Sequence, residues 1–149
     1  MVRHKNRYLV LEINEIGKTD TPLKIKEVSL FESIQNEVKK LHGDFGVAAI
    51  RTGFLSKYIN EHSRTAVIRC RHGPHKFVSS SIPFVKQIFN KNVVISILYI
   101  GASIKQCFSF LKNYQQKKFD EYCVTLKTEE ERNELKDAML NLDSALSKL

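Results

Sequence analysis

Residues 93–100 read VVISILYI, and this run constrains the fold more than any other part of the chain. Its apolar and β-branched side chains are typical of a strand. A strand that is apolar on both faces needs cover on both sides of its sheet, because a strand with one wet face alternates instead. A helix expected from Ile104 to Tyr114, with Phe108 and Leu111 on its apolar face, offers the second cover.

The first half of the chain predicts a strand, a helix and a second strand. Period-two alternation marks residues 8–16 as a strand, and apolar residues at spacings of three and four mark a helix from about residue 26. We expect Gly43 to end this helix in a left-handed conformation. Residues 47–59 are then expected to form the second strand, with a bulge or bend at Gly53.

Residues 65–71, TAVIRCR, predict a third strand that is antiparallel to the second, since only a short turn joins them. A second helix is expected from Phe77 to Phe89, kinked but not broken at Pro83. The order strand, helix, strand, strand, helix, strand is the ferredoxin-like arrangement that RNA-recognition-motif (RRM) domains share. We therefore predict an α+β, RRM-like βαββαβ sandwich with an antiparallel sheet and additional C-terminal helices covering its second face.

Charge divides the 149 residues, of formal net charge +8, into a basic body and an acidic tail. Residues 1–127 carry 21 Lys and Arg against 10 Asp and Glu, whereas residues 128–149 carry 3 against 6. We expect an RRM-like domain with a basic N-terminal arm over 1–127 and an acidic amphipathic helix over 128–149. Thr128 and Glu131 have the spacing of a capping box at the start of that helix. Its expected apolar positions are Leu135, Met139, Leu142, Leu146 and Leu149.

A basic body suits a polyanionic partner, either RNA, DNA or an anionic membrane surface. A protein whose charge only aids solubility fits the composition equally well. No apolar run approaches the length of a transmembrane helix, so we expect a soluble or peripheral protein. Three cysteines without a CxxC pair point to a reducing compartment.

Motifs that carry catalysis or metal binding are not found. The chain has no phosphate-cradling glycine loop, zinc-finger spacing or nucleophile elbow. The nearest ligand cluster, CRHGPH, holds Cys70, His72 and His75 but lacks a second ligand pair, so we favour a strand-end cysteine and loop histidines over zinc. Cys70 alternates with Arg69 and Arg71, which predicts an inward-facing thiol and not a nucleophile. We assign no catalytic residue and no metal ligand.

An RRM domain binds single strands by stacking bases on aromatic side chains of its first and third strands. This chain offers Tyr8 on the first strand and no aromatic on the third, so the stacking platform is missing. RNA contact would instead run through loops, strand-end arginines and the N-terminal arm, and would read backbone and shape. The basic arm consists of Arg3, His4, Lys5 and Arg7.

Five motifs occur in order over residues 1 to about 120. They are VRHKNRYLVLEI (2–13), LHGDFGVAAIRTGF (41–54), VIRCR (67–71), IPFV (82–85) and YIGASIKQCFSFLKNYQ (99–115). This ordered set resembles the Pop-five-type protein subunit shared by ribonuclease P and ribonuclease MRP. One departure is Ala102, which stands where many members carry a second glycine.

The resemblance implies a non-catalytic protein that binds and stabilises the catalytic RNA of ribonuclease P, and of ribonuclease MRP as well. The particle removes the 5′ leader of precursor tRNA, and the MRP form processes precursor rRNA. Catalysis belongs to the RNA with its magnesium ions, so this chain is expected to bind no cofactor. The implied partners are that RNA, precursor tRNA indirectly, the barrel-shaped protein subunit and other proteins of the particle, with no membrane. The implied location is the nucleus and nucleolus.

The resemblance also assigns the basic arm to RNA phosphates, with a solvated N-terminus as the alternative. Arg69 and Arg71 lie in the third-strand motif, where they either contact RNA or pair with Glu12 or another carboxylate. A competing hypothesis is a protein–protein scaffold module of another nuclear assembly, without direct RNA contact.

Overall fold

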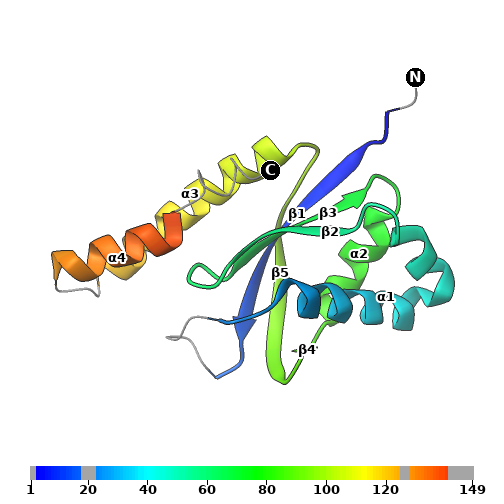
Figure 1. Ribbon diagram of the computed structural model, residues 1–149, viewed down its shortest axis with the longest axis horizontal. Coiled ribbons are helices and arrows are strands. Elements are labelled where there is room, and N and C mark those ends of the chain that lie inside the picture. Colours follow the sequence, from blue (N-terminus) through cyan, green and yellow to red (C-terminus); the bar gives the residue numbers. More distant parts are fainter. Residues whose placement is uncertain (1–2, 18–22, 125–127, 141–149) are drawn as a thin grey trace.

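The computed structural model describes residues 3–17, 23–124 and 128–140 and shows a five-stranded antiparallel sheet with helices on both faces (Figure 1). The strands are ordered β2-β3-β1-β5-β4 across the sheet. The elements, in chain order, are β1 (Asn6–Glu15), α1 (Glu27–Ile50), β2 (Leu55–Asn60), β3 (Thr65–Arg71), α2 (His75–Ser81), the 3-10 helix η1 (Ile82–Phe84), β4 (Gln87–Ile88), β5 (Lys91–Gly101), α3 (Ile104–Cys123) and α4 (Glu129–Leu140). The predicted α+β, ferredoxin-like arrangement is confirmed.

The side chains of the central strand β1 point alternately into two separate hydrophobic cores, one on each face of the sheet. Leu9, Leu11 and Ile13 are buried in the larger core, which lies between the sheet and helices α1 and α2. Tyr8 and Val10 point the other way, into a smaller cluster beneath α3. The sheet therefore buries side chains on both of its faces, while Val94 and Ile100 of β5 remain exposed.

Helix α3 provides the second cover that the apolar strand β5 requires. Cys107, Phe108 and Leu111 are buried against the sheet, so the predicted apolar face of this helix is confirmed. Ser103 caps the helix by accepting a hydrogen bond from the Gln106 backbone N–H at 3.3 Å. Figure 1 shows α3 on one side of the sheet and α1 and α2 on the other.

A buried glutamine fastens α3 to the neighbouring strands. The side-chain amide of Gln115 donates hydrogen bonds to the Tyr58 hydroxyl at 3.2 Å and to Ser63 Oγ at 3.0 Å. Ser63 Oγ in turn lies 2.7 Å from Thr65 Oγ1. A buried polar side chain is tolerated only where it finds such partners, so this cluster fixes where α3 sits on the sheet.

The first helix is interrupted at Gly43 but is followed directly by further helix. Gly43 (φ +68°, ψ −162°) leaves the helical conformation, as the expected end of the helix requires, and a second helical segment of α1 then continues to Ile50. The expectation of a strand over 47–59 is therefore wrong for its first part. Val47 and Ile50 both pack on the larger core at a helical spacing of three, and this packing selects the helix.

The second strand is correspondingly short and begins at Leu55. Gly53 has a φ of +84° and belongs to the turn before β2, where a left-handed conformation is needed. The bulge or bend that was predicted within the strand is therefore a turn that precedes it. The register of β2 shifts instead between Ser56 and Tyr58.

The second helix ends earlier than expected. The prediction of a kinked helix from Phe77 to Phe89 is wrong, because α2 stops at Ser81 and Pro83 lies in the 3-10 turn η1. Proline has no backbone N–H and clashes with the preceding turn, so at this site it ends the α-helix. The chain then forms β4, whose Ile88 is still buried in the larger core.

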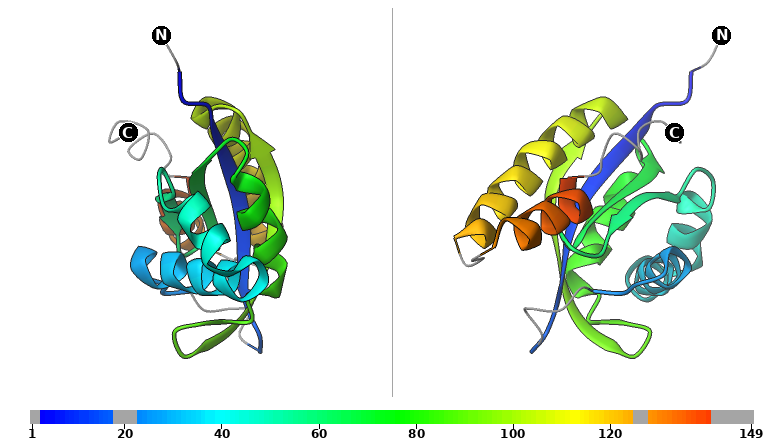
Figure 2. Two further views of the ribbon diagram at one scale, coloured as in Figure 1. Left: turned by 90° about the vertical axis from the view of Figure 1, so that its right-hand side faces the viewer. Right: turned by 60° about the vertical axis from the view of Figure 1, so that its left-hand side comes forward.

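The last helix begins as the capping pattern predicts, with the Glu131 N–H donating to Thr128 Oγ1 at 3.4 Å. Helix α4 lies beside α3 in both views of Figure 2, and the Asn60 side chain donates to the Ala138 carbonyl at 3.1 Å. Leu142, Leu146 and Leu149 lie outside the described residues, and the division of the chain at residue 127 stays a prediction. None of the described helices has the length and apolar composition to cross a bilayer.

Truncation of Leu111 tests whether α3 is an integral part of the fold. Leu111 is fully buried between α3 and the sheet, so Leu111→Ala should lower the free energy of unfolding by about 2–5 kcal/mol in urea titration. The neighbouring Lys112→Ala removes an exposed side chain and should change it by no more than about 0.5 kcal/mol. Equal effects of the two changes would show that α3 is not docked as described.

Candidate nucleic-acid interface

The arginines singled out in the sequence meet at one end of the sheet. Strands β1 and β3 are antiparallel, so the start of β1 lies beside the end of β3. Arg7 is opposite Cys70, and Tyr8 is opposite Arg69. Asn6 pairs in the same way with Arg71. The structure thus brings the base of the arm and the arginines of β3 together.

These arginines occupy both faces of that sheet end. Arg69 and Arg71 alternate with buried Ile68 and Cys70, which places them on the face that α3 covers. Arg7 has the parity of Leu9 and therefore lies on the opposite face, toward α2. A polyanion that reaches this end of the sheet meets positive charge on either side.

The turn after α1 packs against both β3 arginines. Arg69 Nε donates a hydrogen bond to the Gly53 carbonyl at 3.3 Å. A Cβ added to Gly53 would lie 3.1 Å from Cγ of Arg71, so the side chain of Arg71 runs along this glycine. The turn also carries the exposed Arg51 to the same end. Sequence reasoning missed Arg51, because it read residues 47–59 as a strand.

The expected alternative, in which Glu12 neutralises a β3 arginine, is wrong. The Glu12 carboxylate accepts a hydrogen bond from the Tyr114 hydroxyl at 2.6 Å and lies 3.7 Å from Lys118 Nζ. Burial, followed by this hydrogen bond and the Glu12 charge, raises the pKa of Tyr114, so its hydroxyl remains a donor. Within the described part of the chain, no carboxylate forms an ion pair with Arg69 or Arg71.

The exposed basic arm is anchored to the segment that follows β3. The Lys5 carbonyl accepts a hydrogen bond from the His72 N–H at 2.8 Å, which prolongs the ladder between β1 and β3. Arg3, His4 and Lys5 are exposed. Anchoring of the backbone leaves these three side chains available to a ligand.

Two stacked histidines lie close to Arg7 at this end of the sheet. The rings of His72 and His75 stack with their centroids 5.3 Å apart, and His75 Nδ1 accepts the Gly73 N–H at 3.0 Å. Burial lowers the pKa of His75, and the positive charges of His72, Arg7 and Lys76 lower it further. His75 and Lys76 therefore belong to the same electropositive surface as Arg7. No group of three potential metal ligands occurs among the described residues.

Cys70 faces inward, as its alternation with the arginines predicts. It is only 1% exposed, and its Sγ donates to the Arg7 carbonyl at 3.7 Å. Burial raises the pKa of this thiol to about 12, which leaves almost no thiolate at neutral pH. The thiol contributes to the core and is unsuited to attack on a substrate.

The sheet face on which RRM domains stack bases is occupied by protein. Tyr8 packs into the cluster beneath α3, and Tyr99 stacks on Phe110 with centroids 5.0 Å apart. Both tyrosines are only partly exposed, so α3 obstructs the stacking of a base on them. The surface open to a nucleic acid is thus the end of the sheet and the arm, where contacts to phosphates dominate.

The chain matches the model of the Rpp14/Pop5 family over residues 7–112. The zebrafish (Danio rerio) ribonuclease P/MRP protein subunit POP5 is 29% identical, over 99% of this chain and 90% of its own length. The human subunit of that name is 31% identical, over 78% of this chain and 74% of its own length. A chain in the cryo-EM structure of yeast ribonuclease MRP shares the fold with a TM-score of 0.53 at 17% identity, covering 85% of this chain and 99% of that one.

The matched range includes Arg7 at the base of the arm, both β3 arginines and most of the α3 face. These are the parts of the chain that form the candidate interface. With most of its length inside that match, the chain belongs to the Rpp14/Pop5 family.

Proposed function

We propose that this chain is a non-catalytic protein subunit of the ribonuclease P ribonucleoprotein, and of ribonuclease MRP, that binds and stabilises the catalytic RNA. The observation that carries the proposal is the cluster of arginines where β1 meets β3, none of which forms an ion pair with a carboxylate among the residues that the structure describes. In a family whose named relatives are ribonuclease P/MRP subunits, RNA is the polyanion that such a cluster would meet.

Phosphate binding requires cations that reach the ligand without a compensating carboxylate. The exposed arm, Arg69, Arg71 and Arg51 meet that requirement at one end of a rigid sheet. Each such contact releases counterions from the RNA, so affinity depends on salt and little on base sequence. Binding through phosphates is compatible with the packing of α3 on the sheet face where RRM domains stack bases.

The proposed role leaves the chemistry to the RNA. The RNA with its magnesium ions would cleave the 5′ leader from precursor tRNA, or precursor rRNA in the MRP particle, while this chain binds neither cofactor nor substrate directly. The barrel-shaped subunit and other proteins of the particle would be its protein partners. The nucleus and nucleolus would be its location, and no membrane is involved.

A pull-down of the tagged full-length chain from nuclear extract tests this role. The retained RNA is sequenced, and the same beads are assayed for cleavage of precursor tRNA. Recovery of a ribonuclease P or MRP RNA together with leader cleavage supports the proposal. Recovery of proteins without such an RNA would overturn it and favour a protein–protein scaffold.

Removal of the arm charges should weaken RNA binding in a salt-dependent way. For the variant with Arg3→Gln, Lys5→Gln and Arg7→Gln, the slope of log affinity against log salt should become shallower by about 2 to 3, because three phosphate contacts are lost. Filter binding to the RNA recovered above, over a range of salt concentrations, measures the slope.

The matched control removes three exposed lysines of α3 and α4, namely Lys112, Lys117 and Lys136, by substitution with glutamine. It changes the net charge equally but leaves the sheet end intact, so its slope should stay near that of the unaltered chain. Equal losses in the two variants would mean that the arm has no specific role.

RNA affinity should rise as the pH falls from about 7.5 to 6. The pKa of His75 is held below its usual value by burial and by neighbouring positive charge, and a bound phosphate would offset part of that repulsion. Binding should then take up protons, whereas the free protein should lose stability over the same range, because its unfolded state protonates His75 first.

The change His75→Asn should flatten the pH dependence of RNA affinity. His62→Asn, at the exposed turn at the opposite end of β3, should not. Fluorescence anisotropy at several pH values measures both variants. A pH profile that His75→Asn leaves unaltered would remove this histidine from the interface.

A further inference from the structure

The tip of the β4–β5 hairpin displays a phenylalanine that the fold does not use. Phe89 is 78% exposed, and its φ of +53° lies in the left-handed region that asparagine and glycine favour. No ring contact involves Phe89 among the described residues, whereas the adjacent Ile88 is buried. The hairpin thus holds an aromatic ring in solvent in a backbone conformation that costs stability.

Three lysines surround this ring. A hollow of about 360 Å³ is lined by Lys24, Ile25, Lys26, Ser29, Ile88, Phe89 and Lys91. Lys91 Nζ donates to the Lys24 carbonyl at 2.9 Å, which ties β5 to the segment before α1. No carboxylate belongs to this lining in the described part of the chain, so the hollow combines an open aromatic face with positive charge.

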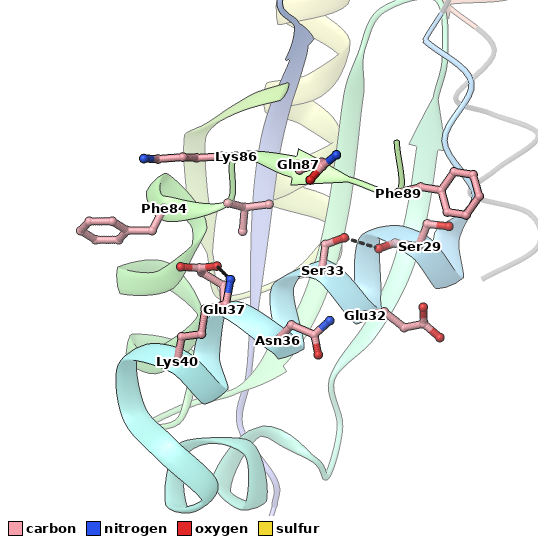
Figure 3. A pocket seen from close by; sticks show the side chains of 11 residues that line it. Ser29, Glu32, Ser33, Asn36, Glu37, Lys40, Phe84, Lys86, Gln87 and Phe89 are labelled. Carbon is pink, nitrogen blue, oxygen red and sulfur yellow. Dashed lines mark hydrogen bonds and ion pairs between the residues drawn. The ribbon is translucent and has the colours of Figure 1, made fainter. Parts of the chain in front are cut away.

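A polar groove of about 630 Å³ continues from the hollow between α1 and the hairpin (Figure 3). Figure 3 shows Phe84 with Lys86 and Lys40 toward one end, Gln87 in the middle, and Phe89 with Ser29 and Glu32 toward the other. Glu37 is bound to Lys40 at 3.5 Å. The three lysines of the hollow lie at the Phe89 end, where Glu32 of α1 is the carboxylate that lines the adjoining groove.

We propose that the β4–β5 hairpin is a second RNA contact, at which an unpaired base stacks on Phe89 and the flanking phosphates bind Lys24, Lys26 and Lys91. Its location separates it from the arm, because Val93 of β5 is opposite Glu15, the last residue of β1, whereas the arm lies at the start of that strand (Figure 1). The proposal rests on the proposed function in one respect, namely that the partner of this chain is an RNA.

Single-stranded RNA fits the hollow better than a protein partner does. Lysine is depleted in the cores of protein interfaces, yet three of the seven residues that line the hollow are lysines. Proteins that bind single strands combine such cations with aromatic side chains on which bases stack. The volume also lies near the lower limit for small-molecule sites, about 300 Å³, which suits a nucleotide and not an amphipathic helix.

Tryptophan fluorescence can observe this contact directly, because the chain contains no tryptophan. In full-length Phe89→Trp, titration with a mixed-sequence single-stranded RNA of about twelve nucleotides should quench the emission to saturation, as a base stacks on the indole. A fully paired duplex of the same sequence should quench it much less. Val124→Trp, at a position 86% exposed beyond the end of α3, is the matched control and should remain unquenched.

A second variant separates stacking from a structural role. Phe89→Asn relieves the left-handed strain, so it should raise the melting temperature while weakening affinity for the single-stranded RNA several-fold. Phe89→Tyr should keep the affinity. Unchanged affinity in Phe89→Asn, or no quenching in Phe89→Trp, would overturn the proposal. A blue shift with a protein of the particle but not with RNA would identify the hairpin as a protein contact and overturn it as well.

The arm variant distinguishes failure of this inference from failure of the proposed function. Salt-dependent RNA binding that the arm variant weakens, without quenching at residue 89, would sink the hairpin contact alone. If no RNA binds by either measure, the proposed function fails with it. Quenching at residue 89 that survives in the arm variant supports two independent contacts.

Discussion

The need to bury both faces of the sheet governs the rest of the molecule. Strand β5 is rich in apolar residues from Val93 to Ile100, and the alternating side chains of β1 pack into two cores, so each face of the sheet needs cover. Helices α1 and α2 cover one face, and α3 covers the other, where the buried Gln115 sets its position. Without α3, the cluster around Leu111 would be exposed, and the sheet would have the open face of an RRM domain.

Because α3 covers the second face of the sheet, it also limits where a nucleic acid could bind. Because α3 and its aromatic side chains pack against the partly buried Tyr8 and Tyr99, base stacking on this face of the sheet is obstructed. The ends of the sheet remain available for binding. Antiparallel pairing of β1 and β3 collects the arm and the β3 arginines at one end, while Glu12, the nearest carboxylate considered from the sequence, is held by Tyr114 and Lys118. The same helix that fills the face thus holds Glu12 away from the arginines at the strand end.

Sequence reasoning succeeded where a single periodicity was decisive. The bounds of β3 and the apolar face of α3 follow directly from alternation and from spacings of three and four. It failed at residues 47–54, where a short apolar run suits a strand or a helix, and only packing against the larger core selects the helix. It failed again after Ser81, because a proline two residues later permits a kink or a break and local rules do not choose between them.

The candidate interface shows the same division between local and tertiary information. Basic residue types are visible in the sequence. The contact between Gly53 and Arg69, however, depends on the turn before β2, which sequence analysis had assigned to a strand. For the same reason sequence analysis missed Arg51. The exposed position of Phe89 was hidden for a related reason, since a helix through residue 89 would have placed that ring on an apolar stripe. Hairpin geometry, not composition, makes it accessible.

Two contacts at opposite ends of one sheet would explain how a small protein organises an RNA without reading its sequence. Strand β1 has ten residues, so the arm and the hairpin are about 30 Å apart, joined by a sheet that carries a core on each face. Once one end binds, the other faces a tethered RNA at high effective concentration, and two weak contacts combine into a strong one. Only an RNA fold that presents a phosphate backbone and an unpaired base at that separation would bind both contacts at once. Selectivity would then arise from the spacing and not from base-edge hydrogen bonds, which the occupied sheet face no longer permits.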